Sequence, residues 1–226
     1  MQLLVEQTHS NNIESTPMLS APPHYASSGP IRFVANSSPL PLRSPGLVVR
    51  RVTSLDERLA TDLLVRRMYS WRGYLAEPAQ HALHDPNRVT IAAWQGDELA
   101  ATLTLSRDDG KEMLCESLYK NEIALLRKKN LQICEYSRLA TDQEHSSPEL
   151  LEKLFRTAYF ISRSHFGASD AVVEVNPRHC RYYERQWGFT RIGPLRVCPR
   201  VDAPAVLLHR SLQHPLPESM LGAMAA

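Results

Sequence analysis

The apolar positions between residues 46 and 212 repeat with two different periods, and these periods predict a succession of strands and helices. Segments in which every second residue is apolar, or in which apolar residues run together, are typical of strands. These segments are 46–54, 89–106, 131–142, 168–177, 189–197 and 204–212. The segment 89–106 is interrupted at Gln95-Gly96-Asp97, which indicates a hairpin.

Helices are predicted in the four segments between these strands, at 55–75, 112–129, 148–167 and 178–188. Apolar residues three and four positions apart define the inner face of an amphipathic helix. The inner faces are predicted to hold Leu59, Leu63, Leu64 and Met68 in the first helix, and Leu151, Leu154, Ala158 and Ile161 in the third. Ser147 followed by Pro148 is an N-cap followed by a proline at the first helical position, which predicts where the third helix begins.

The alternation of strands and helices predicts one α+β (or α/β) domain over residues 46–212, with a central mixed, twisted sheet flanked by helices. Residues 1–45 contain seven of the chain's sixteen prolines and many serines. Such a composition buries too little apolar surface to offset chain entropy, so we predict a disordered leader there. Residues 213–226 are predicted to be a flexible tail.

Composition narrows the possible classes of function. Twenty-six basic against twenty-four acidic residues give a net charge of +2, without the basic excess that is typical of a nucleic-acid-binding domain. Four cysteines without CxxC spacing favour a reducing, cytoplasmic location and give no indication of a metal site. The N-terminal sequence does not resemble a signal peptide, and no segment is apolar for long enough to predict a membrane span.

The strand predicted at 131–142 carries charged residues where a core strand would be apolar. In strict alternation Glu135 and Ser137 share one face, and Arg138 lies on the other. Because burying a charge is costly unless it is paired or used, these residues are candidates for function. The structural alternative is a buried Glu135–Arg138 ion pair that only fixes the strand, although alternation argues against it.

Several segments of the chain resemble a known family of enzymes. The sequence VNPRHCRYYERQWGF (175–189) is similar to the late strand and helix of GCN5-related N-acyltransferases. Together with VRRMYSWRGYL (65–75), CEYSRLATD (134–142) and PRVDAPAVLL (199–208), it resembles the long-chain N-acyl amino acid synthases, which are relatives of the acyl-homoserine lactone synthases.

The resemblance implies transfer of a fatty acyl group from a pantetheine thioester to a free amine. It also implies acyl carrier protein as a partner and an amino acid as the acceptor, with no permanently bound cofactor. An amine must lose a proton before it attacks, and a desolvated glutamate has a raised affinity for that proton. Glu135 is therefore the predicted base, and Ser137 is predicted to hold a water molecule or the substrate. Arg138 resembles the arginine in the E-x-S-R motif of the lactone synthases.

Tyr183 matches the position of a tyrosine that protonates the departing thiolate in acyltransferases of this fold. Its alternative role is simple packing, because Tyr183, Gln186 and Trp187 share one helical face.

On the acceptor side, Arg66, Tyr69 and Tyr74 match the family's early helix, where Arg66 is suited to bind the substrate carboxylate in a bidentate manner. The alternative for Arg66 is an ordinary surface arginine.

The loop 141–149 bears on the carrier of the acyl group. Acetyl-coenzyme A users of this fold hold the pyrophosphate in a glycine-rich turn, whereas this loop contains no glycine and three acidic residues. We therefore expect acyl carrier protein as the donor in preference to coenzyme A. Arg178, Arg181 and Arg185 form a basic stripe that is predicted to dock this acidic protein, with 127–129 as a second basic cluster; a solvated helix face is the alternative.

Two alternatives to an N-acyl amino acid synthase stay open on the sequence. The first is an acyl-homoserine lactone synthase-like enzyme, which would use S-adenosylmethionine as the acceptor. The second is a non-catalytic domain of the same fold that senses an acyl chain or a partner. Loss of Glu135 would favour the sensor, and Glu135 is present.

Overall fold

The computed structural model describes residues 46–74, 82–214 and 216. The predicted leader (1–45) and most of the predicted tail (213–226) lie outside the described residues. The strands are β1 (Leu47–Arg51), β2 (Arg88–Gln95), β3 (Glu98–Arg107), β4 (Ile133–Thr141), β5 (Asp170–Val175), β6 (Thr190–Arg191), β7 (Arg196–Cys198) and β8 (Ala203–Ser211). The helices are α1 (Leu55–Trp71), α2 (Glu116–Lys128), α3 (Pro148–Ser164), the short 3₁₀-helix η1 (Pro177–His179) and α4 (Cys180–Trp187).

The strands form one mixed sheet in the order β1-β2-β3-β4-β5-β8-β6, with β7 paired to β8. All neighbouring strands are antiparallel except β4 and β5, which are parallel and joined through α3. The hairpin between β2 and β3 turns at Gly96 and Asp97, with Gly96 at φ 62°, as its sequence predicts. The predicted strand at 189–197 is divided into β6 and β7.

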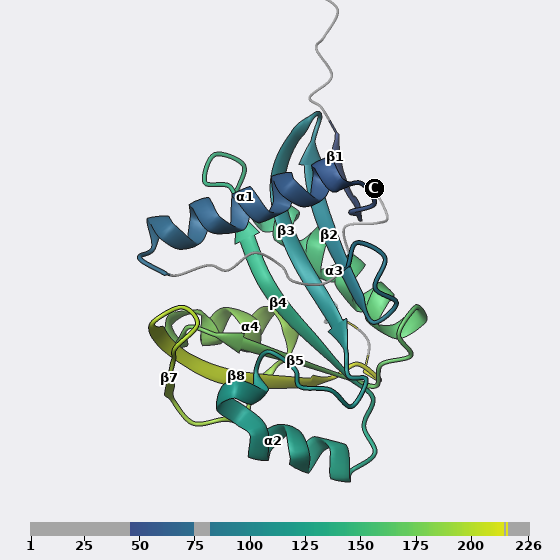
Figure 1. The fold of residues 1–226 in the computed structure, drawn as a ribbon, viewed down its shortest axis with the longest axis vertical. Helices are drawn as coiled ribbons and strands as arrows, with labels where there is room; N and C mark the ends of the chain where they lie inside the picture. The colour runs from purple at the N-terminus through teal and green to yellow at the C-terminus, as the bar shows by residue number, and fades with distance from the viewer. Residues whose placement is uncertain (1–45, 75–81, 215, 217–226) are drawn as a thin grey trace, which may run out of the picture. The chain divides into compact units, whose positions relative to one another are not determined.

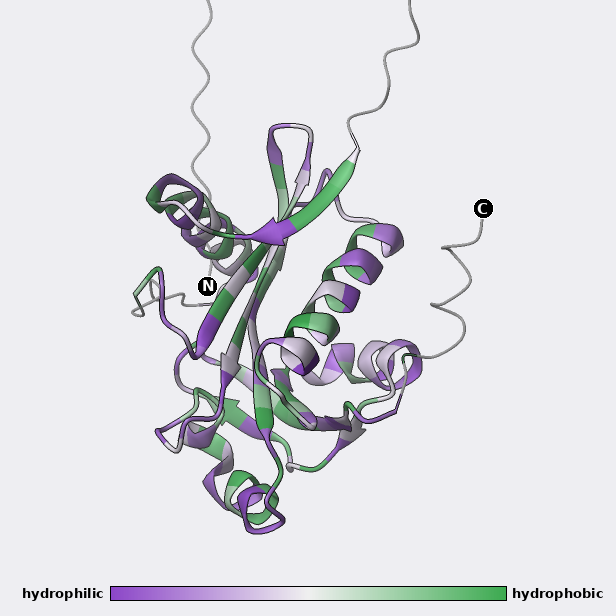
Figure 2. Cartoon of the chain, turned by 90° about the vertical axis from the view of Figure 1, so that its right-hand side faces the viewer, coloured by the Kyte–Doolittle hydropathy of each residue, from purple (hydrophilic) through white to green (hydrophobic). Residues whose placement is uncertain are grey.

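Helices cover both faces of the sheet (Figures 1 and 2). In Figure 1, α1 and α2 lie in front of the sheet, and α3 and α4 lie behind it. Alternation along β4 follows this arrangement, because Ile133 packs in the cluster under α2, whereas Cys134 and Tyr136 pack with the residues of α3 and α4.

The rotation of α1 differs from the one expected from its leucines. Leu64 and Met68 are buried as predicted, but Leu59 and Leu63 are 61% and 63% exposed. The buried stripe instead runs through Thr61 and Val65, which are spaced with Leu64 and Met68 at i, i+3, i+4 and i+7. Thr61 is tolerated in the core because its hydroxyl donates a hydrogen bond to the carbonyl of Arg58 at 2.8 Å.

The start of α3 agrees with the prediction. The hydroxyl of Ser147 accepts a hydrogen bond from the amide of Leu150 at 3.1 Å, and Pro148 is the first helical residue. Leu154, Ala158 and Ile161 are buried against the sheet as predicted, whereas Leu151 is half-buried.

A β-bulge in β4 changes which side chains reach the front of the sheet. Thr104 pairs with Ser137 and Thr102 with Ala140, so Leu103 alone lies opposite Arg138 and Leu139. Arg138 adopts φ 56°, the left-handed conformation that a bulge of this kind accommodates. Its guanidinium therefore reaches α1, on the same side of the sheet as Glu135, and the prediction that the two residues occupy opposite faces is wrong.

The parallel ladder between β4 and β5 is short. It pairs Ile133–Tyr136 with Asp170–Val173, and beyond these residues the two strands diverge (Figure 1). The backbone groups and side chains at this divergence therefore face an opening in the middle of the sheet.

Candidate active site

A cavity of about 730 Å³ lies at the divergence of β4 and β5. Much of its wall is aliphatic or aromatic. This apolar wall includes Leu103, Leu139, Leu151, Phe155, Val173 and Val175. A volume in this range is typical of sites that enclose most of a small ligand.

The carboxylate of Glu135 lies in the wall of this cavity although its side chain is only 2% exposed. It accepts a hydrogen bond from the amide of Leu114 at 3.0 Å and one from the amide of Cys115 at 2.8 Å. Burial raises the pKa of Glu135 above its ordinary value, and the two amides and the charge of Arg200 oppose that rise. A carboxylate can accept about four hydrogen bonds, so Glu135 keeps acceptor capacity for a substrate.

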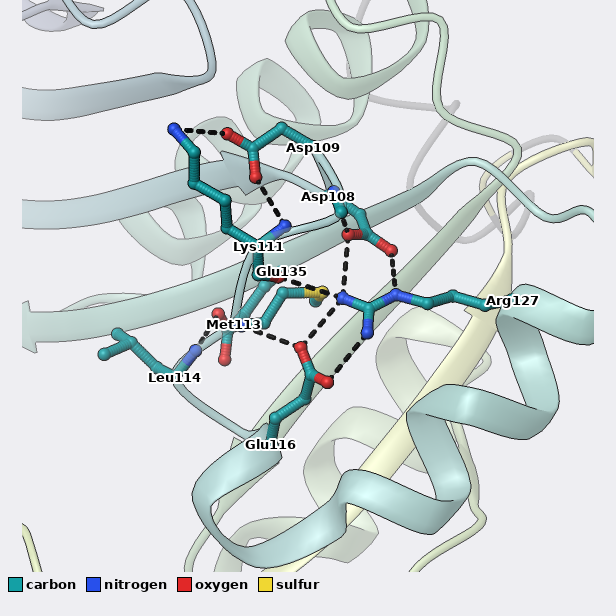
Figure 3. A network of polar contacts seen from close by, with 9 residues as sticks. Asp108, Asp109, Lys111, Met113, Leu114, Glu116, Arg127 and Glu135 are labelled. Carbon is teal, nitrogen blue, oxygen red and sulfur yellow. Dashed lines mark hydrogen bonds and ion pairs between the residues drawn. The ribbon is translucent and has the colours of Figure 1, made fainter.

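An ion-pair network fixes the loop that supplies these two amides (Figure 3). Arg127 lies 2.7 Å from Asp108 and 2.7 Å from Glu116. Glu116 in turn accepts a hydrogen bond from the amide of Met113 at 2.8 Å, immediately before Leu114. Arg127, which the sequence placed in the second basic cluster, is thus half-buried and already paired with two carboxylates.

Ser137 and Arg138 also line the cavity, and their hydrogen bonds and ion pair lead to other residues. The hydroxyl of Ser137 lies 3.4 Å from the carbonyl of Thr104. Arg138 forms an ion pair with Asp62 of α1 at 2.8 Å. Arg138 therefore pairs with Asp62, and Glu135 is held by backbone amides, so the two do not form the ion pair that was the structural alternative.

Tyr183 reaches the cavity from α4, with a side chain that is 5% exposed. Its ring packs edge-on against Phe155 and Phe189, with centroid distances of 5.6 and 5.8 Å. Burial raises the pKa of its hydroxyl, which keeps the proton on the oxygen at neutral pH. In the described part of the chain, no residue forms a hydrogen bond with that hydroxyl.

The three residues predicted for the acceptor side separate in the structure. Tyr69 and Tyr74 both line the cavity, with their rings edge-on at 6.2 Å. Arg66 is exposed on α1 and does not line the cavity. Arg72 does line it, from a position that is six residues, or about 9 Å of helix axis, further toward the C-terminal end. The prediction that Arg66 binds a substrate carboxylate therefore has no support in this geometry.

The predicted docking stripe is also divided. Arg178 lies in η1 and lines the cavity, whereas Arg181 and Arg185 lie on α4, are exposed and do not line it. The stripe is divided because Arg178 belongs to a separate 3₁₀ turn that precedes α4. Asn176 caps this turn, and its side-chain oxygen accepts a hydrogen bond from the amide of Arg178 at 3.2 Å.

The cavity is also lined by an ion pair that the sequence did not indicate. Arg200, between β7 and β8, donates to both carboxylate oxygens of Glu174 at 3.0 Å. It also donates to the carbonyl of Leu114, the residue whose amide holds Glu135. The charge on Glu174 within a strand was a signal that sequence reasoning could have used, but nothing around Arg200 pointed to its partner.

The sheet that opens between β4 and β5, with a buried acid and an apolar cavity at the opening, defines an acyltransferase fold of the GCN5-related class. The crystal structure of the AHL synthase LasI has this fold, with a TM-score of 0.56 and 14% identity over 79% of this chain and 96% of that chain. ElaA from Escherichia coli has it as well, with a TM-score of 0.54 and 11% identity over 74% and 99% of the two chains.

The structure of FeeM, an N-acyl amino acid synthase from uncultured soil microbes, is more similar than these two. It has a TM-score of 0.70 and 25% identity over 76% of this chain and 94% of that chain. Residues 60–211 match the family described as N-acyl amino acid synthase FeeM. The chain therefore belongs to the FeeM family of N-acyl amino acid synthases, and it is an acyltransferase. No curated protein sequence matches it.

These findings confirm the predicted fold and family. Acyltransferases of this family use acyl thioesters as co-substrates. In the described part of the chain, no helix is both long enough and apolar enough to span a membrane.

Proposed function

We propose that this protein transfers a long-chain fatty acyl group from the thioester of acyl carrier protein to the amine of an amino acid. The product is an N-acyl amino acid. The observation that carries this proposal is the buried carboxylate of Glu135 in the wall of a largely apolar cavity, at the point where β4 and β5 diverge. An apolar wall suits a fatty chain, and a desolvated carboxylate suits an ammonium group that has to lose a proton.

In the proposed reaction, Glu135 takes a proton from the ammonium group of the acceptor, and the neutral amine attacks the thioester carbon. The carbon–nitrogen bond forms, and the nitrogen then releases its second proton to solvent. The carbon–sulfur bond breaks as the tetrahedral intermediate collapses to the amide and the thiol, and Tyr183 regains its proton from solvent. The amides of Leu114 and Cys115 hold the carboxylate in place, and the hydroxyl of Ser137 is close enough to the same wall to orient the acceptor or a water. General-base catalysis of this kind contributes typically about 10²–10⁴ in rate.

Tyr183 gives its proton to the departing thiolate in this proposal. Its support is a hydroxyl that lines the cavity, remains protonated because of burial, and has no hydrogen-bond partner among the described residues. A buried tyrosine hydroxyl usually has a partner, so the substrate is a natural candidate for that partner.

Acyl carrier protein is the proposed source of the acyl group. The loop between β4 and α3 offers no glycine-rich turn for the pyrophosphate of coenzyme A. It carries Asp142 and Glu144, and Glu149 follows in the first turn of α3. Arg181 and Arg185 are exposed on α4 and are proposed to contact the acidic carrier protein. Reversing both to glutamate should raise the Michaelis constant for the carrier protein and leave that for a small thioester unchanged. An unchanged constant for the carrier protein would remove these arginines from the docking surface.

The function is tested by incubating the protein with long-chain acyl carrier protein and the twenty amino acids, followed by mass spectrometry. The expected product is an N-acyl amino acid. An acyl-homoserine lactone formed with S-adenosylmethionine would support the lactone synthase instead. Absence of any acyl product, with acyl binding that survives Glu135→Gln, would support the sensor.

A further inference from the structure

Four side chains that offer hydrogen-bond donors line the cavity on the side of η1. Arg72 and Tyr74 come from the segment that follows α1, and Arg178 and His179 come from η1. The guanidinium of Arg178 joins the two segments, because it donates to the hydroxyl oxygen of Tyr74 at 3.3 Å. These four residues are called the η1 cluster below.

The hydrogen bonds inside the cluster occupy acceptors of Tyr74 and His179 and leave their protons to donate. The oxygen of Tyr74 accepts from Arg178 and also from the side-chain amide nitrogen of Asn176, at 3.0 Å. A hydroxyl has two acceptor lone pairs and one proton, so these two bonds use its acceptor capacity and leave its O–H to donate. The Nε2 of His179 accepts from the Nε of Arg178 at 3.1 Å, so the proton of the neutral imidazole is on Nδ1.

The cluster also gathers the positive charges of Arg72 and Arg178. Among residues 46–74 and 82–214, no carboxylate forms an ion pair with Arg72 or Arg178. The effect of the two arginines is visible on their neighbour, because burial and then the charges of Arg178 and Arg72 lower the pKa of His179. Like charges and hydrogen-bond donors gathered at one side of a cavity form a receptor for an anion.

The cluster lies at some distance from the proposed reaction centre. Val172 pairs with Glu135, and Asn176 follows four residues later, which corresponds to about 13 Å along the strand. The η1 cluster therefore lies beyond the end of β5, displaced along the cavity from the position at which the strand pairs with Glu135. This displacement suits a ligand that carries its negative group at one end of an extended chain whose other end reaches Glu135.

We propose that the η1 cluster binds the phosphate at the end of the donor's pantetheine arm. This inference rests on the proposed function, and it specifies how the donor is recognised. The phosphate is common to the arm of acyl carrier protein and to coenzyme A, so the site recognises chemistry that both donors share. It supplies the anion-binding role that the acidic loop between β4 and α3 is poorly suited to fill.

Direct binding tests the site without requiring turnover. Calorimetry compares 4′-phosphopantetheine with pantetheine, using the full chain and its Arg72→Gln, Arg178→Gln and Tyr74→Phe variants. Wild type should bind the phosphorylated arm about tenfold more tightly or better, and Arg178→Gln should remove most of that preference. Arg163→Gln is the matched control, because Arg163 is exposed on α3 and does not line the cavity. Equal affinity for the two arms in wild type would overturn the proposal.

Kinetics then identify the source of the phosphate and separate this site from the catalytic proposal. Arg178→Gln should raise the Michaelis constant about tenfold for acyl carrier protein and acyl-coenzyme A, and should not change it for acyl-pantetheine, which has no phosphate. An effect on the carrier protein alone would assign the site to that donor. A raised constant for the amino acid, with the donor constants unchanged, would reassign the cluster to the acceptor and refute the proposal. A phosphate preference without turnover from any donor would retain the site and refute the proposed transfer.

Discussion

Replacing Glu135 with glutamine removes the proposed base while nearly preserving the shape of its side chain. The expected loss in kcat/KM is about 10²–10⁴, the usual contribution of general-base catalysis. That loss corresponds to about 3–5 kcal/mol of transition-state stabilisation. Steady-state rates with long-chain acyl carrier protein and a saturating amino acid measure it.

The same substitution has a structural effect that must be measured beside the rate. Both carboxylate oxygens of Glu135 accept backbone N–H groups, whereas a glutamine side chain places an NH₂ group at one of these two positions, facing the amide of Leu114 or Cys115. An N–H left without an acceptor costs about 1–3 kcal/mol. The neutral amide is, however, cheaper to bury than a carboxylate, which offsets part of that cost. Denaturant unfolding therefore has to show a folded variant before its rate is interpreted.

The pH dependence separates the two effects. The base must be ionised, so wild-type kcat/KM should fall as pH decreases through the pKa of Glu135, which burial raises above the ordinary 4.5. Because the folded pKa exceeds the unfolded value, ionisation of Glu135 also reduces the unfolding free energy as pH rises from 4.5 through the folded pKa. Both features should vanish in Glu135→Gln.

Glu174 provides the matched comparison, because it is a carboxylate in the same cavity that already pairs with Arg200. Glu174→Gln should retain the acidic limb of the rate profile even if its overall rate falls. A folded Glu135→Gln variant with turnover within about threefold of wild type would refute the assignment of Glu135 as the base, given the rate that a general base contributes. Loss of the acidic limb in Glu174→Gln alone would transfer that role to Glu174.

Further predictions concern the proton donor and the packing that supports the site. Tyr183→Phe should lower kcat about a hundredfold, and thioesters with a more acidic leaving thiol should reduce the loss; equal losses for all thiols would contradict this. Gly193→Ala should cost about 1–3 kcal/mol in denaturant unfolding, because an added Cβ would lie 2.6 Å from the ring of Tyr119. Gly46→Ala, which meets no atom within 4 Å, is the control, and equal stability of the two variants would refute the packing argument. Arg127→Met should cost about 3 kcal/mol because it leaves two mostly buried carboxylates unpaired; an unchanged unfolding midpoint would contradict this.

Local signals explain which parts of the fold could be predicted. Ser147 and Pro148 specify the start of α3 through a cap and a preset backbone angle, and Gly96 specifies the hairpin turn through its positive φ. These features depend on neighbours in the sequence. The motifs that carried the family resemblance are likewise contiguous segments, and the family match confirms the assignment that rested on them.

The parts that could not be predicted depend on contacts between distant segments. The bulge at Arg138 appears only when β4 is paired with β3, and it is this bulge that directs the side chain to α1. Both Arg66 and Arg72 are candidates from the sequence alone, and only the position of α1 and its C-terminal end against the sheet determines which of them reaches the cavity. Arg200 meets Glu174 across 26 residues, a separation at which one sequence gives no pairing signal.

A single-turnover experiment tests the central claim most directly. Wild-type protein is mixed in excess with carrier protein that bears one labelled long acyl chain, in the presence of the accepted amino acid, and the reaction is quenched and resolved by mass. We predict that the label moves from the thioester to the amino-acid nitrogen in wild type, and remains on the carrier in a folded Glu135→Gln variant. Transfer at the same rate in both proteins, or release of the label only as free fatty acid, would contradict the account.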